Sequence, residues 1–551
     1  MCYHTQSIKS IKTMAKVIFK SYNPNDSLLL PPCLGDYLPQ NHKARVVSAI
    51  IDRLDISDIE SGYKGGGTSS YNPRMLLKVI VYAYLNNVYS GRQMEKFLVE
   101  NIAYMWLSGM QTPDFRTINL FRSRRLSGKF DSIFTQIVSL LHEEGLVSLN
   151  VQYIDGTKIE SAANKYTFVW KGSTEKNKAK LEANVKSVLE SAEKVLALEN
   201  ADEEQELTAD EMAKRADNIL NKMDEAGISD KKMRKAVEKV KAEKAPKMRE
   251  YEKKLDTLGE RNSYSKTDPD ATFMRMKEDA MNNGQTKPGY NIQIATENQF
   301  ITNYDIFWRP TDQGTLIPFL ESFKDRFGKQ SEEVCADSGY GSEQNYEYMF
   351  DEDITPYVKY NMFHAEDKRS RRNNPFLTQN LYYNAEDNYY VCPMGQHMEH
   401  IGDVPVKSDL GYVSTISRYR ARNCAGCPLR GMCYKGASDQ RVIEVNHRNN
   451  AYRACVKRLL TSERGMYHRS NRPVEPEAVF GDIKYNHGFK RFRLRSNEKV
   501  KVEFGLVALA HNIRKYMAVS ISKNDNNSAD NVLKQACATG SMQWSSLAQA
   551  S

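Results

Sequence analysis

The sequence predicts an α/β core, preceded by an all-α N-terminal domain and interrupted by two insertions. Residues 72–144 carry apolar side chains three or four positions apart, which is typical of helices. Strand-like stretches follow at 151–159, 290–296 and 301–308, and the last two alternate with period two. Beyond them, a helical pattern at 316–323 is followed by strand-like runs at 333–337 and 354–360, so helices and strands alternate.

Composition shifts divide the 551 residues into segments, which is ample length for several domains. We expect an N-terminal segment (1–40), a helical DNA-binding domain (41–148), a first part of the core (149–173), a helical or coiled-coil insertion (174–262), the continued core (263–360), a Cys-rich insertion (361–450), C-terminal catalytic helices with a basic segment (451–520) and a disordered tail (521–551). The helical insertion is predicted as a structural or dimerisation arm, with a DNA-contacting arm as the alternative.

The net charge of +9 is concentrated in one segment. Residues 451–517 contain 15 Lys or Arg and 6 Asp or Glu, a surplus of 9 that equals the surplus of the whole chain. A solvated basic face would explain such a surplus, but a basic segment next to acidic metal candidates fits binding to a nucleic-acid backbone better. The sequence therefore predicts double-stranded DNA as a partner.

Apolar runs and the N-terminus indicate a cytoplasmic protein. Apolar runs such as 75–81 are much shorter than the roughly 20 residues that a membrane span needs. Residues 1–20 carry scattered lysines and no continuous apolar stretch, unlike a signal peptide. We therefore expect no membrane association.

Three acidic residues stand at points where a metal could be held. Asp155 lies inside a strand pattern and is followed by Gly156, and Asp337 follows the apolar run 334–336 at the carboxyl end of a strand. Glu477 follows Pro476 in the first turn of a predicted helix. Carboxylate oxygens suit Mg²⁺, and two such ions can drive in-line phosphoryl transfer. Each residue alone is a weak signal, because most acidic residues lie on the surface.

Basic residues flank these positions. Lys484 lies seven residues after Glu477, which on a helix places both on one face, and Arg472 precedes the glutamate. We expect both to hold DNA phosphates, together with the basic strip Lys490, Arg491, Arg493 and Arg495. In the N-terminal domain a helix is predicted to begin at Thr112-Pro113-Asp114 and to present Arg122, Arg124 and Arg125 to DNA; an exposed solubilising face is the alternative.

Four of the nine cysteines are spaced as in a zinc site. Cys424, Cys427 and Cys433 form a C-x₂-C-x₅-C run, and Cys392 supplies a fourth thiol. Four thiolates suit structural Zn²⁺, although His397 and His400 are possible fourth ligands and reduced, unliganded cysteines remain an alternative. The aromatic residues near basic segments, Trp170, Trp308, Phe489 and Phe492, are expected to pack in the core rather than to stack on a base.

The acidic motifs resemble those of bacterial insertion-sequence DDE transposases. The resemblance is carried by Tyr-Ile-Asp-Gly-Thr-Lys around Asp155, Ala-Asp-Ser-Gly-Tyr-Gly around Asp337, and the block from Arg472 to Lys484 that contains Glu477. It extends to residues 488–492 and 510–512, and to the helical block 73–126.

This resemblance implies an RNase H-like fold in which Asp155, Asp337 and Glu477 hold two Mg²⁺ or Mn²⁺ ions. It also implies a homodimer that binds the terminal inverted repeats of its element, cuts at the ends and transfers them to target DNA. Two positions stay open. Tyr467, Arg469 and Arg472 do not match the spacing of the family's tyrosine, arginine, glutamate, lysine signature, so Glu475 is a rival to Glu477. Asp312 lies where relatives often carry another acidic residue.

Two other functions remain compatible with the sequence. One is a metal-dependent DNA nuclease without strand transfer, and the other is a DNA-binding protein derived from a transposase that no longer catalyses the reaction. The intact acidic residues favour an enzyme over the second alternative.

Overall fold

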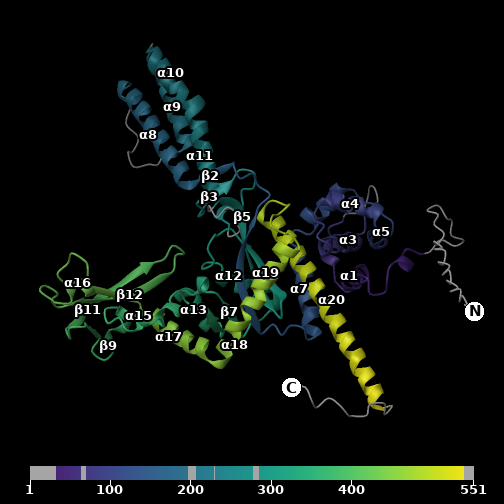
Figure 1. The fold of residues 1–551 in the computed structure, drawn as a ribbon. Coiled ribbons are helices and arrows are strands. Elements are labelled where there is room, and N and C mark those ends of the chain that lie inside the picture. The colour runs from purple at the N-terminus through teal and green to yellow at the C-terminus, as the bar shows by residue number, and fades with distance from the viewer. Residues whose placement is uncertain (1–32, 64–69, 197–206, 229, 277–284, 539–551) are drawn as a thin grey trace, which may run out of the picture.

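The computed structural model describes residues 33–63, 70–196, 207–228, 230–276 and 285–538, with side chains as far as Ser520. A central sheet connects three outlying parts: a helical N-terminal part, a helical arm and a second, antiparallel sheet (Figure 1). Most of the N-terminal segment 1–40 and the last part of the tail, 539–551, lie outside the described residues.

The N-terminal part is built around one buried helix, α3 (Pro73–Leu85). Asn72 accepts hydrogen bonds from the first free backbone N–H groups of this helix, and Pro73 occupies the first helical position. The other helices are α1 (Lys43–Asp52), α2 (Ser57–Glu60), α4 (Gly91–Glu100), α5 (Ile102–Ser108), α6 (Phe115–Leu120) and α7 (Phe130–Glu143). The helix start predicted at Asp114 is confirmed, because its side chain accepts a hydrogen bond from Thr117 N at 2.8 Å.

The central sheet has the strand order that the predicted fold class requires. Strands β6 (Phe300–Phe307), β5 (Thr286–Glu297), β1 (Val151–Glu160), β7 (Glu333–Ala336) and β8 (Thr355–Val358) lie side by side in this order, and β4 (Thr272–Arg275) extends the edge beside β6. β5 is antiparallel to both β6 and β1, whereas β1, β7 and β8 are parallel. Three antiparallel strands followed by two parallel ones form an RNase H-like sheet, so the predicted α/β class is confirmed.

Helices cover both faces of this sheet. On one face α12 (Leu316–Phe327), α13 (Glu343–Asp351) and α17 (His447–Thr461) share an apolar core with β1, β7 and β8. On the other, α7 and the long α20 (Asn497–Ala538) share a core with β5 and β6, and α20 also packs on α3. α20 therefore joins the N-terminal part to the sheet. It continues to Ala538, so its backbone is helical through residues 521–538, where we expected a disordered tail; this stretch contains no Gly or Pro that would end a helix.

The first insertion is a bundle of helices that projects from the sheet (Figure 1). It consists of α8 (Lys171–Val195), α9 (Ala209–Glu225), α10 (Lys231–Lys239) and α11 (Ala245–Leu258), which enclose an apolar core of their own. The short strands β2 (Phe168–Trp170) and β3 (Ser263–Ser265) pair at its base. A capping box begins α9, since the side chains of Thr208 and Glu211 each accept the other's backbone N–H.

The second insertion contains a five-stranded antiparallel sheet. Its order is β13 (Val442–Val445), β12 (Val413–Ala421), β11 (His397–Lys407), β10 (Tyr389–Val391) and β9 (Tyr382–Asn384), followed along the chain by the helices of the C-terminal part. There α18 (Glu463–Asn471) continues into a π-helical turn (Pro473–Glu477), the short α19 (Ala478–Gly481) and a second π-helical turn (Asp482–Asn486). This segment carries the third acidic position to the sheet.

Candidate active site

Three carboxylates from distant parts of the chain converge on one guanidinium. Arg472 Nη2 lies 3.4 Å from Asp155 Oδ1 and 3.6 Å from Asp337 Oδ2, while Arg472 Nη1 lies 2.8 Å from Glu477 Oε1. The arginine side chain is 9% exposed, whereas those of Asp337 and Glu477 are about half exposed. The structure thus brings together the three acidic residues singled out in the sequence.

The strand register explains why two of them are neighbours. β1 and β7 run parallel with Ile154 opposite Ala336, so Asp155 and Asp337 are the next residues on adjacent strands. Asp337 directly follows β7, and its Oδ1 accepts a hydrogen bond from Ser338 N at 2.7 Å. The carboxyl end of β7 is therefore fixed in place beside the middle of β1.

A π-helical turn explains the unusual spacing between Arg472 and Glu477. In a regular α-helix, residues five positions apart point about 140° away from each other. The turn Pro473–Glu477 is π-helical, with more residues per turn, which brings both side chains to one face. The turn thus lets Arg472 reach Glu477 despite their five-residue separation.

Electrostatics in the site favour a charged arginine. Burial lowers the pKa of Arg472, but the nearby Asp155, Asp337 and Glu477 outweigh burial and raise the pKa above its ordinary value. Arg472 Nε is buried and has no hydrogen-bond partner within the described part of the chain. The guanidinium therefore neutralises acidic side chains in this structure and does not face outward, contrary to our expectation that it holds a DNA phosphate.

Glu475 points away from the carboxylates. Its Oε2 accepts a hydrogen bond from Gln299 N at 2.8 Å, in the turn between β5 and β6. Burial raises the pKa of the Glu475 carboxyl, against the opposing effect of the Gln299 N–H. Its contacts fasten the π-helical turn to the sheet, and the structure places Glu477 at the site instead.

A polar layer of side chains lies beside the carboxylates. Asp312 Oδ1 accepts hydrogen bonds from Asn291 Nδ2 at 2.8 Å and from Gln293 Nε2 at 3.0 Å, and Tyr340 OH donates to Gln293 Oε1. A Cβ on Gly156 would clash with Gln293 Nε2 and Asp312 Oδ1, so a larger residue at this position would have to displace this layer. Sequence reasoning left Asp312 open and missed Asn291 and Gln293, although their alternation on one strand was visible.

The arginines of the N-terminal domain differ from expectation. Arg122 is only 3% exposed, and its Nη1 donates to Tyr84 OH and to Tyr89 O, both at 2.9 Å. It therefore faces the interior and is unable to contact DNA in this structure. The π-helical turn Phe121–Arg125 rotates it inward, while Arg124 is exposed and Arg125 lies over the ring of Tyr63.

The C-terminal basic residues fall into two groups. Lys490 and Arg493 are exposed, and Lys490 Nζ lies 4.4 Å from the centre of the Tyr485 ring. Arg491 and Arg495 are also exposed but donate to backbone carbonyls of residues 161–163. Lys484 is 6% exposed and lies in the second π-helical turn, so its predicted contact with a phosphate stays a prediction.

The four clustered cysteines line one small cavity in the second insertion. Cys392, Cys424, Cys427 and Cys433 all contribute to its wall. Cys427 N donates to Cys424 O at 3.4 Å around Gly426, and Gly395 N donates to Cys392 O at 2.8 Å, so two tight turns present the thiols. Arg441 donates from its backbone to Cys424 Sγ and from Nη1 to Cys433 Sγ, at 3.4 and 3.0 Å. His397 stacks on Tyr389 and His400 pairs with Asp403, and neither lines the cavity.

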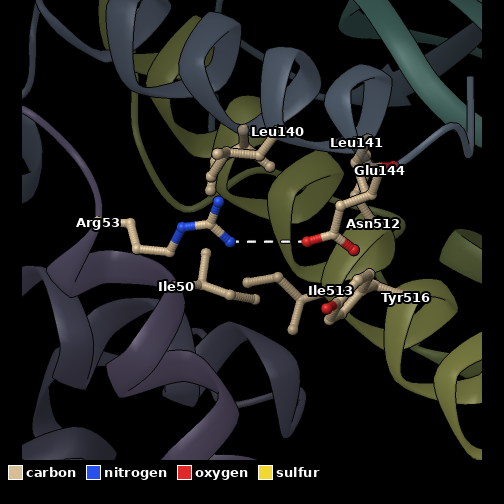
Figure 2. A pocket seen from close by; sticks show the side chains of 9 residues that line it. Ile50, Arg53, Leu140, Leu141, Glu144, Asn512, Ile513 and Tyr516 are labelled. Carbon is tan, nitrogen blue, oxygen red and sulfur yellow. Dashed lines mark ion pairs between the residues drawn. The ribbon is translucent and has the colours of Figure 1, made fainter.

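A different pocket lies in the seam between α1, α7 and α20 (Figure 2). Arg53 and Glu144 point toward each other across it, with 3.6 Å between Nη1 and Oε1, and Ile50, Leu140 and Ile513 line it (Figure 2). Its lining is mainly apolar and includes none of the acidic site residues, so we interpret it as a packing seam.

Two family models match the chain. One, described as a transposase DDE domain, matches residues 391–517, and the other, described as a transposase domain (DUF772), matches residues 32–124. Both matched models are transposase domains, and together they support an insertion-sequence DDE transposase. The first match includes Glu477, Arg472 and the cysteine cluster, and the second covers most of the helical N-terminal part of this transposase. Comparison with curated proteins and with solved structures gives no match.

The acidic residues of this transposase have the donor atoms that a divalent cation prefers. They offer oxygen ligands from rigid elements, and a positive group already lies among them. Among the described residues, neither these carboxylates nor the four clustered cysteines form a group of three or more side chains already positioned to hold a metal. Within the described ranges, moreover, no helix is both long and apolar enough to cross a membrane.

Proposed function

We propose that this transposase binds the terminal inverted repeats of its element, cleaves at their ends and joins them to target DNA. The observation that carries the proposal is the convergence of Asp155, Asp337 and Glu477 on a single cation at the edge of an RNase H-like sheet. Phosphoryl transfer needs little covalent chemistry from the protein, so positioned charges provide most of the catalysis. The acidic site and the adjacent basic segment supply such positioned charges.

Asp155, Asp337 and Glu477 would hold Mg²⁺ or Mn²⁺. Two such ions, when bound, activate the attacking oxygen and stabilise the leaving oxygen of an in-line displacement. Arg472 neutralises the three carboxylates in this structure, and its guanidinium would have to move away for these oxygens to bind a divalent ion. Ser338 N keeps Asp337 oriented at 2.7 Å, while the exposed Lys490 and Arg493 neutralise backbone phosphates.

One site can serve both chemical steps of the reaction. Water is the nucleophile in end cleavage, and the 3′-hydroxyl that cleavage releases is the nucleophile in strand transfer. Both steps break and form a phosphodiester bond, so the same charges stabilise both transition states. We further propose that two copies of the chain act together on the two element ends in the cytoplasm.

The test uses Asp337→Asn on DNA that carries an element end. We expect the variant to bind the end as the native protein does and to lose Mg²⁺-dependent cleavage, because one oxygen ligand loses its charge. Unchanged cleavage would overturn the assignment. Supplying native protein with pre-cut ends then separates a transposase from a nuclease, since only a transposase yields products joined to target DNA.

A structural Zn²⁺ is proposed for the second insertion. Two tight turns direct Cys392, Cys424 and Cys427 at one cavity, and Cys433 completes a set of four thiols. Arg441 lies against the same cluster, where its backbone N–H donates to Cys424 Sγ and its Nη1 donates to Cys433 Sγ. The ion would close the end of the five-stranded sheet, since a small antiparallel sheet has a limited core of its own.

A further inference from the structure

A basic cleft lies where the helical arm meets the sheet, apart from the acidic site. It has a volume of about 440 Å³ and is lined by Lys165, Lys287, Arg491 and Arg495, with Glu160 as its single carboxylate. Glu160 pairs with Lys287 at 3.2 Å and with Arg491 at 3.6 Å. Four cations face one anion, so the cleft attracts negative charge.

The cleft is built by contacts between remote segments. Glu160 N donates to Lys490 O and Phe492 N donates to Glu160 O, which attaches the basic strip to the end of β1. Arg491 donates to Ser161 O and Ala163 O, both at 3.1 Å. These bonds use part of the Arg491 guanidinium and hold it in position before any ligand arrives.

Exposed aromatic side chains continue from the rim of the cleft. Tyr166, Phe168 and Trp170 follow Lys165 at every second residue, and they are 74%, 51% and 39% exposed. Lys165 Nζ lies 5.0 Å from the centre of the Tyr166 ring, and the rings of Phe168 and Trp170 are 6.4 Å apart. Trp170 is therefore only partly packed, with its ring 5.8 Å from that of the buried Phe273, where we expected a core position; Phe489 and Phe492 are buried as expected.

We propose that this arm-base surface, made of the four cleft cations with Tyr166, Phe168 and Trp170, binds an unpaired DNA strand near the cut. The inference rests on the proposed function and adds a strand-specific site to it. Cations contact the phosphates of any DNA, but aromatic rings stack only on bases whose faces are free. A cationic cleft bordered by exposed rings is therefore suited to a strand that has separated from its complement.

The position of the surface fits a strand that leaves the acidic site. Glu160 lies five residues beyond Asp155 on β1, which corresponds to about 17 Å along a strand. That length equals about five nucleotides of duplex rise. DNA that is opened next to the cleaved bond can therefore reach the arm-base surface without a change in the protein.

DNA binding measured in the absence of metal tests whether the cleft cations contact phosphates. Fluorescein-labelled single-stranded DNA and duplex of equal length are titrated with native protein and with Lys165→Gln/Lys287→Gln. We expect the double variant to bind single strands about tenfold more weakly and to reduce the slope of log K against log salt by about 1.4, the value for two phosphates. Lys329→Gln/Lys435→Gln, which removes two exposed lysines elsewhere, is the matched control and should bind as the native protein does.

Stacking is tested with Trp170→Ala and with Tyr382→Ala, an exposed aromatic in the second insertion, as its control. Single-stranded oligothymidine should quench native tryptophan fluorescence. Trp170→Ala should abolish most of the quenching and weaken binding about tenfold. If Trp170→Ala weakened the binding of duplex and of single-stranded DNA equally, the surface would be a duplex site and the proposal would be wrong. Unchanged quenching in this variant would also contradict the proposal. Asp337→Asn should bind single strands normally, so failure of this inference is distinct from failure of the catalytic assignment.

Discussion

At the scale of single residues, the position of Arg472 explains how three carboxylates can lie close together. Like charges at this separation repel, and the cost is high where a side chain is shielded from water. Asp155 is 17% exposed, so its charge needs a nearby cation. Arg472 supplies that cation, and a divalent ion competes with it for the same oxygens.

Arg472→Gln should therefore bind metal more readily while folding less stably. Without metal we expect the free energy of unfolding to fall by about 1–3 kcal/mol, less than for a fully buried pair because two of the carboxylates are half exposed. Addition of Mn²⁺ should raise the melting temperature more than in the native protein, as measured by calorimetry. Arg458→Gln, at an exposed position, is the control. An equal metal-induced shift in native protein and Arg472→Gln would contradict the role given to Arg472.

The sequence allowed the acidic residues to be predicted better than the basic ones. Asp155 lies inside a strand pattern and Asp337 directly follows one, so both could be placed on the sheet from the sequence. Arg122 was assigned to the surface because arginine usually lies there, yet its hydrogen bonds to Tyr84 and Tyr89 come from tertiary contacts that no local pattern reveals. Trp170 was assigned to the core for its size, but β2 has only one partner strand and leaves the ring exposed.

At the scale of elements, the π-helical turns could not be predicted from the sequence. Helical periodicity predicts which residues share a face only while the turn has about 3.6 residues. The turns Pro473–Glu477, Asp482–Asn486 and Phe121–Arg125 each change that relation locally. Strand and helix order were predictable from alternation, whereas the five-stranded sheet of the second insertion has short, polar strands with weak patterns.

The second insertion should contain one zinc ion per chain. Metal analysis of protein purified without chelator measures the zinc content directly, and strong chelation should lower the melting temperature of the second insertion. Cys427→Ser should lose the metal, because it removes one of four thiolates. Cys455→Ser, outside the cluster, should retain it. Absence of zinc from native protein grown with zinc would contradict the proposed site.

At the scale of the whole molecule, α20 connects the N-terminal part to the catalytic sheet. Asn512 Oδ1 accepts from Ile301 N and its Nδ2 donates to Ile301 O, both at 2.8 Å, which fixes α20 to β6. Arg514 Nη1 donates to Leu85 O at 3.0 Å, at the end of α3. One helix thus holds both parts, so they should unfold together.

Asn512→Ala tests this connection. The change leaves the N–H and C=O groups of the buried Ile301 without these partners, which should lower the free energy of unfolding by about 2–4 kcal/mol. Asn450→Ala, at an exposed helical position, should have little effect. Calorimetry should show a single transition at lower temperature; an unchanged transition would contradict the connection.

The contact between Asp482, in the second π-helical turn, and His511 of α20 should make the stability of the protein depend on pH. Hydrogen bonding with His511, supported by Asn486 and His487, holds the pKa of Asp482 below its usual range. A lowered carboxyl pKa contributes stability above the unfolded pKa of about 3.8, and this contribution is lost as pH falls through the folded pKa. Asp482→Asn should therefore lower the melting temperature at pH 7 but have a shrinking effect below pH 4, as measured by thermal denaturation. A constant difference across this range would contradict the assignment.

The most direct test of the account compares two neighbouring glutamates in Mg²⁺-dependent cleavage of an element end. Glu477 contacts the guanidinium shared with Asp155 and Asp337, whereas Glu475 contacts the β5–β6 turn. Loss of a metal-binding carboxylate should remove several kcal/mol of transition-state stabilisation. We predict that Glu477→Gln slows cleavage by about a hundredfold or more, while Glu475→Gln cleaves at nearly the native rate. Normal cleavage by Glu477→Gln, or its loss only in Glu475→Gln, would contradict the account.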